Sequence, residues 1–235
     1  MLMVNRVAEV EEGAGSSTTE TWKGWYRKRK IGRRKVSRSL SAEVVANLTE
    51  AWYFAAQSLG LNCNLFVTVR PHDINDLTPL QRQERWQDVQ NKIAQFARDH
   101  DSESVYIWCR ESDPVAGTNE HLHMLTHIPT KLIGLFKDNA SGWFAKAAEI
   151  DIRRADYRVR WTASGKQRSA IGYLTKNSPQ AAYGRPREYR KGGPILGKRA
   201  GCSRNIDVSA RAAWEARRAI QREFGIHMPA VVTEG

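Results

Sequence analysis

The chain has 235 residues, of which 41% are hydrophobic and 26% are charged, so it can bury a sizeable core and is not disordered throughout. Its three cysteines, an odd number without a Cys-x-x-Cys spacing, argue against a disulfide-stapled mini-protein and a structural zinc site. Lys and Arg number 37 against 25 Asp and Glu. The resulting net charge of +12 predicts a polyanionic partner, either nucleic acid or an anionic membrane.

The sequence favours nucleic acid over membrane. No stretch approaches the roughly 18–20 apolar residues that are needed to span a bilayer. The first 15 residues contain three glutamates where the apolar region of a signal peptide would lie. We therefore expect an intracellular protein without a membrane partner.

The first 38 residues combine an acidic tail with a basic arm. Residues 1–20 are acidic and then rich in Gly, Ser and Thr, so they are predicted to be disordered. Residues 23–38 contain nine basic residues and no acidic one, beside three aromatic side chains. This segment is either a solvated tail or targeting signal, or an arm that grips phosphates and stacks on bases. In the second interpretation the arm contacts DNA through Arg27, Lys28, Arg29 and Lys30.

The folded part is expected to begin with a helix and a strand. Apolar residues spaced by three or four predict an amphipathic helix over 40–59, with Ser41 as its N-cap and Gly60 as its stop. A short β-branched run then predicts a strand over 64–70. Arg70, at the end of this strand, is expected to contact DNA.

A capping box opens the next helix, because Thr78 is followed by Pro79 and Gln81. The apolar spacing carries this helix to about residue 99. Two strands follow, over 104–111 and 121–128, and the polar loop between them suits an antiparallel hairpin.

Further elements complete a strand-helix-strand-strand-helix-strand-helix order. The apolar spacing predicts a helical stretch over 130–150, with a break near 139–142. A short strand over 157–162 and a helix over 167–176 follow. This order predicts an α+β fold, an antiparallel sheet with helices packed on one face.

The last segment, 183–235, is expected to pack on the same domain. Residues 183–205 are rich in Gly and Arg and have no periodicity, so they are predicted to form a loop. Asp207 can cap a last helix that ends at Gly225. Residues 151–204 contain 14 basic residues and three acidic ones. We expect this region to contact DNA through Arg185, Arg187, Lys198, Arg199 and Arg204.

His121-Leu122-His123 lies within a predicted strand, where alternate side chains share a face, so both imidazoles leave on one side. The pair either holds a metal ion or is simply exposed or hydrogen-bonded. A metal needs a third ligand, and Glu111 is the best-placed carboxylate, because an antiparallel neighbour brings it beside the histidines. The alternatives fit less well. Glu120 has the wrong parity, His127 lies too far along the strand, and His72 requires the first strand to end over the site.

Tyr173 and Lys176 lie three residues apart on a predicted helix and therefore share a face. They are either a half-buried core tyrosine with a solvated lysine, or a nucleophilic phenol beside a cation. A phenol is largely protonated at neutral pH, and a nearby cation favours the phenolate. Tyr183 and Tyr189 are weaker candidates, because they lie in a predicted loop without a positioned helical partner.

These motifs together resemble those of the HUH endonucleases. The matching pieces are the strand FVTVRP (66–71), His-Leu-His on a later strand, and Tyr-x-x-Lys on a helix about 50 residues further on. The resemblance covers residues 64–177 and is greatest to the single-tyrosine initiators of rolling-circle plasmids and single-stranded DNA viruses. Asn177 stands where two-tyrosine initiators carry a second tyrosine. The Cys109-Arg110-Glu111 run also resembles the metal-ligand glutamate of geminivirus-type initiators.

The resemblance implies a ferredoxin-like sheet with the two motif strands central, formed by residues 39–182. It also implies Mg²⁺ or Mn²⁺ on His121, His123 and Glu111, with Tyr173 on a helix laid over the metal. The expected function is replication initiation in the cytoplasm of a bacterial host. Metal-assisted attack by Tyr173 would nick single-stranded DNA at an origin hairpin and leave a 5′-phosphotyrosine link and a free 3′-OH. Because the chain has no Walker A motif, a host helicase and a host polymerase are the expected partners. The alternatives are a non-enzymatic nucleic-acid-binding regulator and a single-tyrosine transposase or relaxase.

Overall fold

The computed structural model describes residues 35–143, 148–155, 160–161, 167–179 and 190–224. The elements within these ranges are, in chain order, β1 (Val36–Ser37), α1 (Ala42–Ser58), β2 (Leu65–Pro71), α2 (Pro79–Asp99), β3 (Tyr106–Glu111), β4 (His121–Thr126), the 3₁₀ turn η1 (Thr130–Leu132), α3 (Ile133–Gly142), β5 (Ala148–Arg154), β6 (Arg160–Trp161), β7 (Gln167–Arg168), α4 (Ala170–Leu174), β8 (Ile195–Leu196), β9 (Ala200–Cys202), the 3₁₀ turn η4 (Arg204–Ile206) and α5 (Val208–Glu223).

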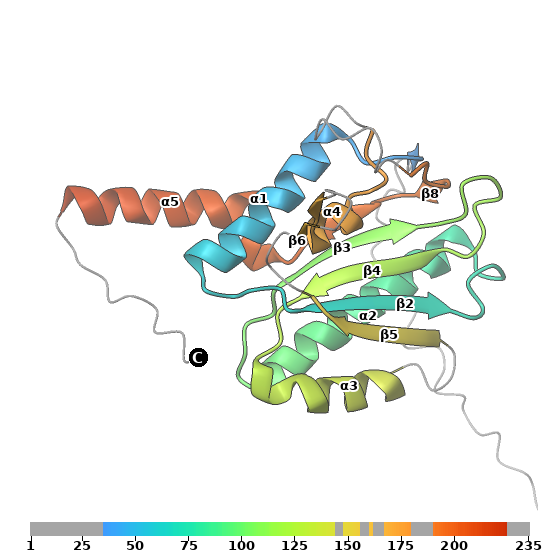
Figure 1. Ribbon diagram of the computed structural model, residues 1–235, viewed down its shortest axis with the longest axis horizontal. Coiled ribbons are helices and arrows are strands. Elements are labelled where there is room, and N and C mark those ends of the chain that lie inside the picture. The colour runs from blue at the N-terminus through green and yellow to red at the C-terminus, as the bar shows by residue number, and fades with distance from the viewer. Residues whose placement is uncertain (1–34, 144–147, 156–159, 162–166, 180–189, 225–235) are drawn as a thin grey trace, which may run out of the picture. The chain divides into compact units, whose positions relative to one another are not determined.

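A five-stranded antiparallel sheet forms the centre, in the order β5-β2-β4-β3-β9 (Figure 1). The strand that carries the two histidines, β4, is therefore the middle strand, and β2 lies beside it. The chain is α+β, as predicted. Among the described helices, none is long and apolar enough to cross a membrane.

The predicted helix starts are confirmed. The Ser41 hydroxyl caps α1 by accepting a hydrogen bond of 3.3 Å from the Val44 amide. Thr78 and Gln81 form the reciprocal capping box of α2. Gly60, just beyond α1, has a φ of 69°, which a glycine adopts without steric cost. These features could be predicted from the sequence because each depends only on residues close together in the chain.

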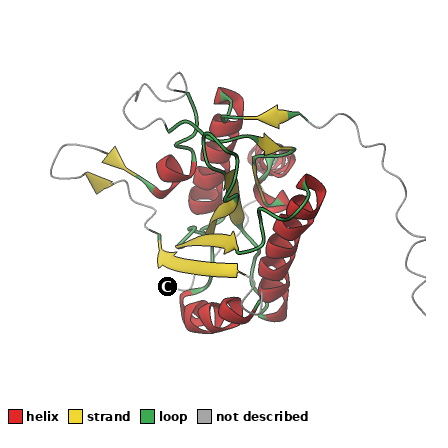
Figure 2. Cartoon of the chain, turned by 90° about the vertical axis from the view of Figure 1, so that its right-hand side faces the viewer, coloured by secondary structure: helices red, strands yellow, loops and turns green. Residues whose placement is uncertain are grey.

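The helices cover both faces of the sheet, and the prediction of one covered face is wrong (Figures 1 and 2). One apolar cluster joins α1 and α4 to the face that carries Ile107, Cys109 and Leu125. The other joins α2 and α3 to the face that carries Leu122 and Met124. Strand residues alternate between these two clusters, because successive side chains of a strand point to opposite faces.

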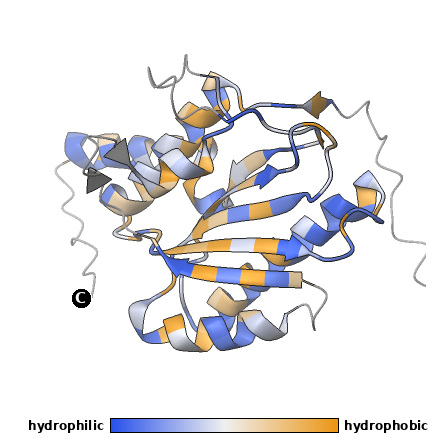
Figure 3. Cartoon of the chain, turned by 45° about the vertical axis from the view of Figure 1, so that its right-hand side comes forward, coloured by the Kyte–Doolittle hydropathy of each residue, from blue (hydrophilic) through white to orange (hydrophobic). Residues whose placement is uncertain are grey.

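The predicted helical stretch over 130–150 ends at Gly142, and residues 148–150 begin the edge strand β5 instead. This strand pairs antiparallel with β2, with Ala148 opposite Pro71 at one end and Arg154 opposite Leu65 at the other. Its apolar residues alternate with charged ones, the period of a half-buried strand, and Figure 3 shows the alternation along the sheet. The helix predicted over 167–176 is also shorter, since β7 occupies 167–168 and α4 ends at Leu174.

Two short strands lie within 183–205, which was predicted to be a loop. β9 pairs with β3 and forms one edge of the sheet. β8 pairs with β1, so residues 36–37 belong to the folded domain and not to the arm predicted over 1–38. Pairing between segments this far apart in the chain leaves little local signal.

Arg199 was predicted to contact DNA, but its side chain is only 4% exposed. Its guanidinium donates to the backbone oxygens of Ser37, at 2.7 Å, and Arg110, at 3.4 Å. It also donates to the Gly193 oxygen and, at 3.1 Å, to the Ser37 hydroxyl. Arg199 therefore connects the segments that contain Ser37, Arg110 and Gly193, using several of its N–H donors. Composition alone does not show that an arginine is buried in this way.

Replacing Arg199 with Met should lower the free energy of unfolding by about 3 kcal/mol, because buried carbonyls lose their donor. The DNA affinity of the folded protein should stay unchanged. Denaturant unfolding and DNA titration measure the two effects, with Lys191→Met at an exposed position as control. A variant that folds normally but loses DNA affinity would contradict this structural role.

Candidate metal and tyrosine site

The β3–β4 ladder brings a carboxylate and two imidazoles together on one face of the sheet. Glu111 stands opposite His121, and Cys109 stands opposite His123. Glu111 Oε2 lies 3.7 Å from His121 Nε2 and 3.6 Å from His123 Nε2. One ligand atom from each of the three residues can be chosen so that all lie within 4.8 Å of one another. The residues proposed from strand parity thus form a group that can hold a metal ion.

Neighbouring polar groups orient both rings. His121 Nδ1 lies 2.9 Å from the Asn119 carbonyl oxygen, and His123 Nδ1 lies 3.0 Å from the Thr68 hydroxyl. A carbonyl oxygen only accepts, so His121 must carry its proton on Nδ1 in this contact, which leaves the lone pair of neutral imidazole on Nε2. Contacts of this kind at the other ring nitrogen orient metal-binding histidines, and here they leave both Nε2 atoms facing Glu111.

The charge state of the group also fits a divalent cation. Burial opposes ionisation of Glu111, but the neighbouring rings of His121 and His123 and the charge of Lys176 outweigh burial and hold the pKa of this carboxyl well below its usual range. Burial lowers the pKa of His123, although Glu111 acts in the opposite direction. The group therefore offers a carboxylate and a neutral imidazole, the forms that ligate metals. Glu111 Oε1 is buried and accepts no hydrogen bond from the described residues, so it too is available.

Lys176 contributes a cation beside this carboxylate. Its Nζ lies 2.9 Å from Glu111 Oε2 and 3.7 Å from the centroid of the Tyr173 ring. The side chain is 9% exposed. Lys176 lies in the turn after α4, not on the helix as predicted, yet it still meets Tyr173 because the turn continues the chain over the same face.

Tyr173 lies on the short helix α4, which begins after the N-cap Ser169, and its ring contacts His123. Its ring makes edge contacts with the rings of His123 and Phe66, each with a centroid separation of 5.5 Å. Tyr173 is nevertheless 45% exposed. Packing fixes the ring on one side, while a substrate can reach the residue from solvent.

The other considered ligands are used elsewhere. Glu120 is buried on the opposite side, where its Oε1 accepts from Trp86 Nε1 at 2.6 Å and from Arg110 Nε at 2.7 Å. His127 Nδ1 lies 2.7 Å from the Asn62 carbonyl oxygen. His72 is exposed and does not belong to the metal-ligating group found among the described residues.

The predicted DNA contacts have different outcomes. Arg70 is exposed, pairs with Glu149 at 3.2 Å, and lies on the same face of β2 as Thr68 by alternation. Lys198 and Arg204 are exposed. Several other predicted positions lie outside the described residues, namely Arg27, Lys28, Arg29, Lys30, Arg185 and Arg187, as do the rival nucleophiles Tyr183 and Tyr189.

Two supporting residues were not singled out from the sequence, Thr68 and Asn119. Thr68 is a polar residue inside the apolar run of β2, and its position across from His123 was hidden until the β2–β4 register was known. Asn119 acts through its backbone oxygen, to which side-chain identity gives no guide.

Comparisons with protein-family models, with curated proteins and with solved structures found no match for this chain.

Replacing Thr68 with Val should weaken Mn²⁺ binding about tenfold, because the ring of His123 loses the hydroxyl that orients it. Thr68→Ser, which keeps the hydroxyl, should restore most of the affinity, and Glu111→Gln should cause a larger loss. Calorimetric titration measures all three. The control is Thr126→Val, another buried threonine of the sheet, whose hydroxyl donates to Val105 O. Equal losses in Thr68→Val and Thr126→Val would contradict the orienting role.

Proposed function

We propose that the chain is a single-stranded DNA endonuclease and strand transferase that uses Tyr173 as its nucleophile and initiates rolling-circle replication. The observation that carries the proposal is the position of an accessible tyrosine and a lysine against a group of one carboxylate and two imidazoles. The carboxylate and the imidazoles come from the neighbouring strands β3 and β4, and the tyrosine and the lysine come from the α4 region further along the chain.

Glu111, His121 and His123 would hold Mg²⁺ or Mn²⁺, and the bound ion supplies Lewis-acid polarisation of a phosphate oxygen. Two imidazoles with one carboxylate suit Mn²⁺ and leave coordination positions for phosphate oxygens. The chain prepares this arrangement by orienting both Nε2 atoms and by keeping Glu111 ionised.

Tyr173 performs the covalent step. Its phenolic proton passes to solvent, its oxygen forms a bond to the scissile phosphorus, and the bond from phosphorus to the 3′ oxygen breaks. The 3′ oxygen takes up a proton, which leaves a 5′-phosphotyrosine link and a free 3′-OH that primes synthesis. Attack by a 3′-OH on the same link rejoins the strand, so the reaction conserves the phosphodiester bond energy.

Lys176 supports the reaction through its charge. Its ammonium lies over the face of the Tyr173 ring, and no hydrogen bond joins it to the phenolic oxygen, both residues being within the described part of the chain. This placement favours a role in stabilising the charge of the bound phosphate over a role in deprotonating the phenol. Arg70, on the same face of the sheet, would hold a neighbouring phosphate.

The preorganised histidines favour an enzyme over a purely DNA-binding regulator, because binding alone needs no aligned ligand atoms. A transposase or relaxase would use the same chemistry and differ only in the DNA that it cleaves. In the proposed role the substrate is an origin, presented as a hairpin, while host enzymes supply helicase and polymerase activity.

Replacing Tyr173 with Phe should abolish the covalent protein–DNA adduct and leave DNA affinity nearly unchanged, because only the phenolic oxygen is lost. The test incubates the protein with Mn²⁺ and circular single-stranded DNA and resolves adducts on a denaturing gel. Tyr53→Phe, at another exposed tyrosine, is the control and should react normally. An adduct that persists in Tyr173→Phe would assign the nucleophile to another residue, with Tyr183 the first to test.

Replacing Lys176 with Met should raise Mn²⁺ affinity but lower the cleavage rate by about 100-fold. The affinity should rise about tenfold, since a like charge a few ångströms from the ion costs more than the ~1.4 kcal/mol that this factor represents. Calorimetry and single-turnover cleavage measure the two effects, with Lys131→Met as an exposed control. An unchanged Mn²⁺ affinity would show that the ammonium does not compete with the metal for Glu111.

A further inference from the structure

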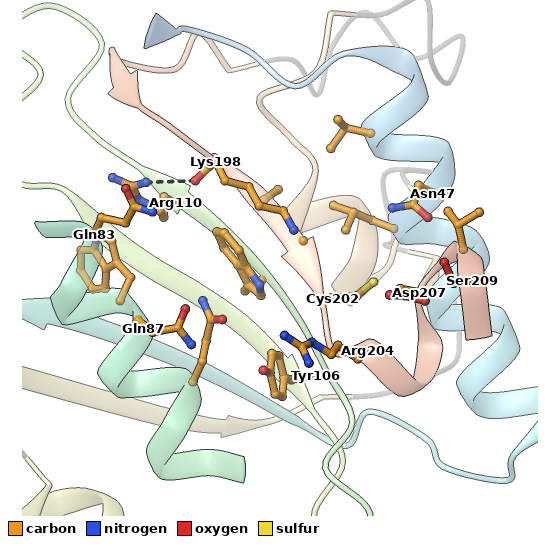
Figure 4. Close-up of a pocket in the computed structure, with 18 residues that line it drawn as sticks. Asn47, Gln83, Gln87, Tyr106, Arg110, Lys198, Cys202, Arg204, Asp207 and Ser209 are labelled. Carbon is orange, nitrogen blue, oxygen red and sulfur yellow. Dashed lines mark hydrogen bonds between the residues drawn. The ribbon is translucent and has the colours of Figure 1, made fainter. Parts of the chain in front are cut away.

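A second feature suited to a ligand lies at the β9 edge of the sheet. It is a pocket of about 590 Å³, bounded by β3 and β9, by α1 and α2, and by the chain that leads from β9 into α5. We call it the edge pocket. Gln83 and Gln87 reach it from α2, and Arg204 reaches it from the segment after β9 (Figure 4). Its volume is within the range of small-ligand sites.

The edge pocket has an aromatic wall on β3. Tyr106 and Trp108 line it and belong to the α2 side of the sheet, whereas Glu111 points to the other side. Gly201 stands opposite Trp108 in the β3–β9 register. A Cβ at this glycine would come within 3.2 Å of Trp108 Cε2 and 2.8 Å of Lys198 Nζ. The glycine therefore lets the Lys198 side chain and the indole ring pack close to the β9 backbone, which a side chain at this position would prevent.

The pocket has an excess of positive charge. Lys198 and Arg204 are exposed, and neither forms an ion pair with a described residue. The Lys198 Nζ lies 5.7 Å from the centroid of the Trp108 ring. Arg110 also lines the pocket, but its charge is balanced by Glu120 at 2.6 Å. The acidic lining residue, Asp207, is occupied as the N-cap of α5, accepting from Ala210 N at 2.9 Å.

The third wall carries side-chain amides. Gln83, Gln87 and Gln90 line the pocket from α2, and their spacing of four and three residues places them on one stripe of the helix. A glutamine amide carries both a donor and an acceptor, as the edges of nucleobases do. The Gln87 Nε2 donates to Asn91 Oδ1 at 3.2 Å, which leaves the Gln87 amide oxygen to accept from a base edge. Aromatic rings, amides and unpaired cations together match the base, its edge and its phosphate.

We propose that the edge pocket binds an unpaired nucleotide of single-stranded DNA, with the base against Trp108 and Tyr106 and the phosphates on Lys198 and Arg204. Stacking on aromatic rings combined with a basic lining is the general way in which proteins hold single strands. The site lies on the opposite face of β3 from Glu111, so it goes beyond the proposed cleavage and requires neither a metal nor Tyr173. It would give the protein a second binding site for the DNA strand, away from the reacting phosphate.

The first test measures affinity without chemistry. Binding of fluorescent dT20 is titrated against salt in EDTA, with Tyr173→Phe as the common background. Lys198→Ala/Arg204→Ala should weaken binding and reduce the log–log salt slope by about 1.4, or ~0.7 for each lost phosphate contact. The matched control is Lys131→Ala/Lys137→Ala, which removes the same charge from exposed positions on η1 and α3. Equal slopes in the two double variants would overturn the proposal.

The second test locates the DNA. Cys63 and Cys109 are buried, whereas Cys202 is partly exposed and lines the edge pocket. Maleimide labelling of Cys202 should slow when dT20 is bound, and this protection should be lost in Lys198→Ala/Arg204→Ala at the same oligonucleotide concentration. Unchanged labelling in the presence of saturating dT20 would overturn the proposal. Equal protection by thymidine monophosphate at the same concentration would assign the pocket to free nucleotides and would also overturn it.

Both measurements keep this proposal separate from the proposed function. Because the background lacks the Tyr173 hydroxyl and the buffer lacks divalent metal, failure of cleavage cannot alter the result. Conversely, a protein that cleaves normally but shows no protection of Cys202 would keep its endonuclease function and lose the edge-pocket site.

Discussion

The candidate site depends on one register, in which Glu111 stands opposite His121 across β3 and β4. A slip of one residue would turn every side chain of β3 to the other face and separate the carboxylate from the imidazoles. Contacts on the opposite face hold this register. There Arg110 and Glu120 form a buried pair at 2.6 Å, and Arg110 also donates to the Leu196 and Lys198 oxygens. A slipped hairpin would bury these charges without partners, at a cost of several kcal/mol.

Charge balance around Glu111 explains why the site can stay assembled without a bound cation. A buried carboxylate needs a counter-charge, and Lys176 supplies one at 2.9 Å. The same ammonium lies over the Tyr173 ring, so one interaction ties the turn after α4 to the β3–β4 hairpin. A divalent ion at Glu111 would compete with this pairing, and the displaced ammonium would then be available to a substrate phosphate. The lysine therefore links the charge balance of the buried carboxylate to the proposed chemistry.

Strand alternation and helix capping were sufficient to predict much of this structure. They identified the face shared by His121 and His123, the carboxylate at Glu111, and the starts of α1 and α2. The errors arose where distant segments decide the outcome. β9 has only three residues and owes its place to pairing with β3, and Arg199 is buried by carbonyls from segments as far away as Ser37. Basic composition predicts a positively charged surface, but it cannot show that Lys198 is exposed while the adjacent Arg199 is buried.

The alternation of β3 also connects the two sites that we propose. Glu111 and Cys109 face the tyrosine side, while Trp108 and Tyr106 face the edge pocket. β9 is short and forms the edge of the sheet, so a DNA strand that occupied both proposed sites would have to pass this edge. Affinity gained in the edge pocket would leave the tyrosine side free for exchange of strands. This division suits a transesterase, whose covalent step is reversible and gains nothing from holding the cleaved ends too tightly.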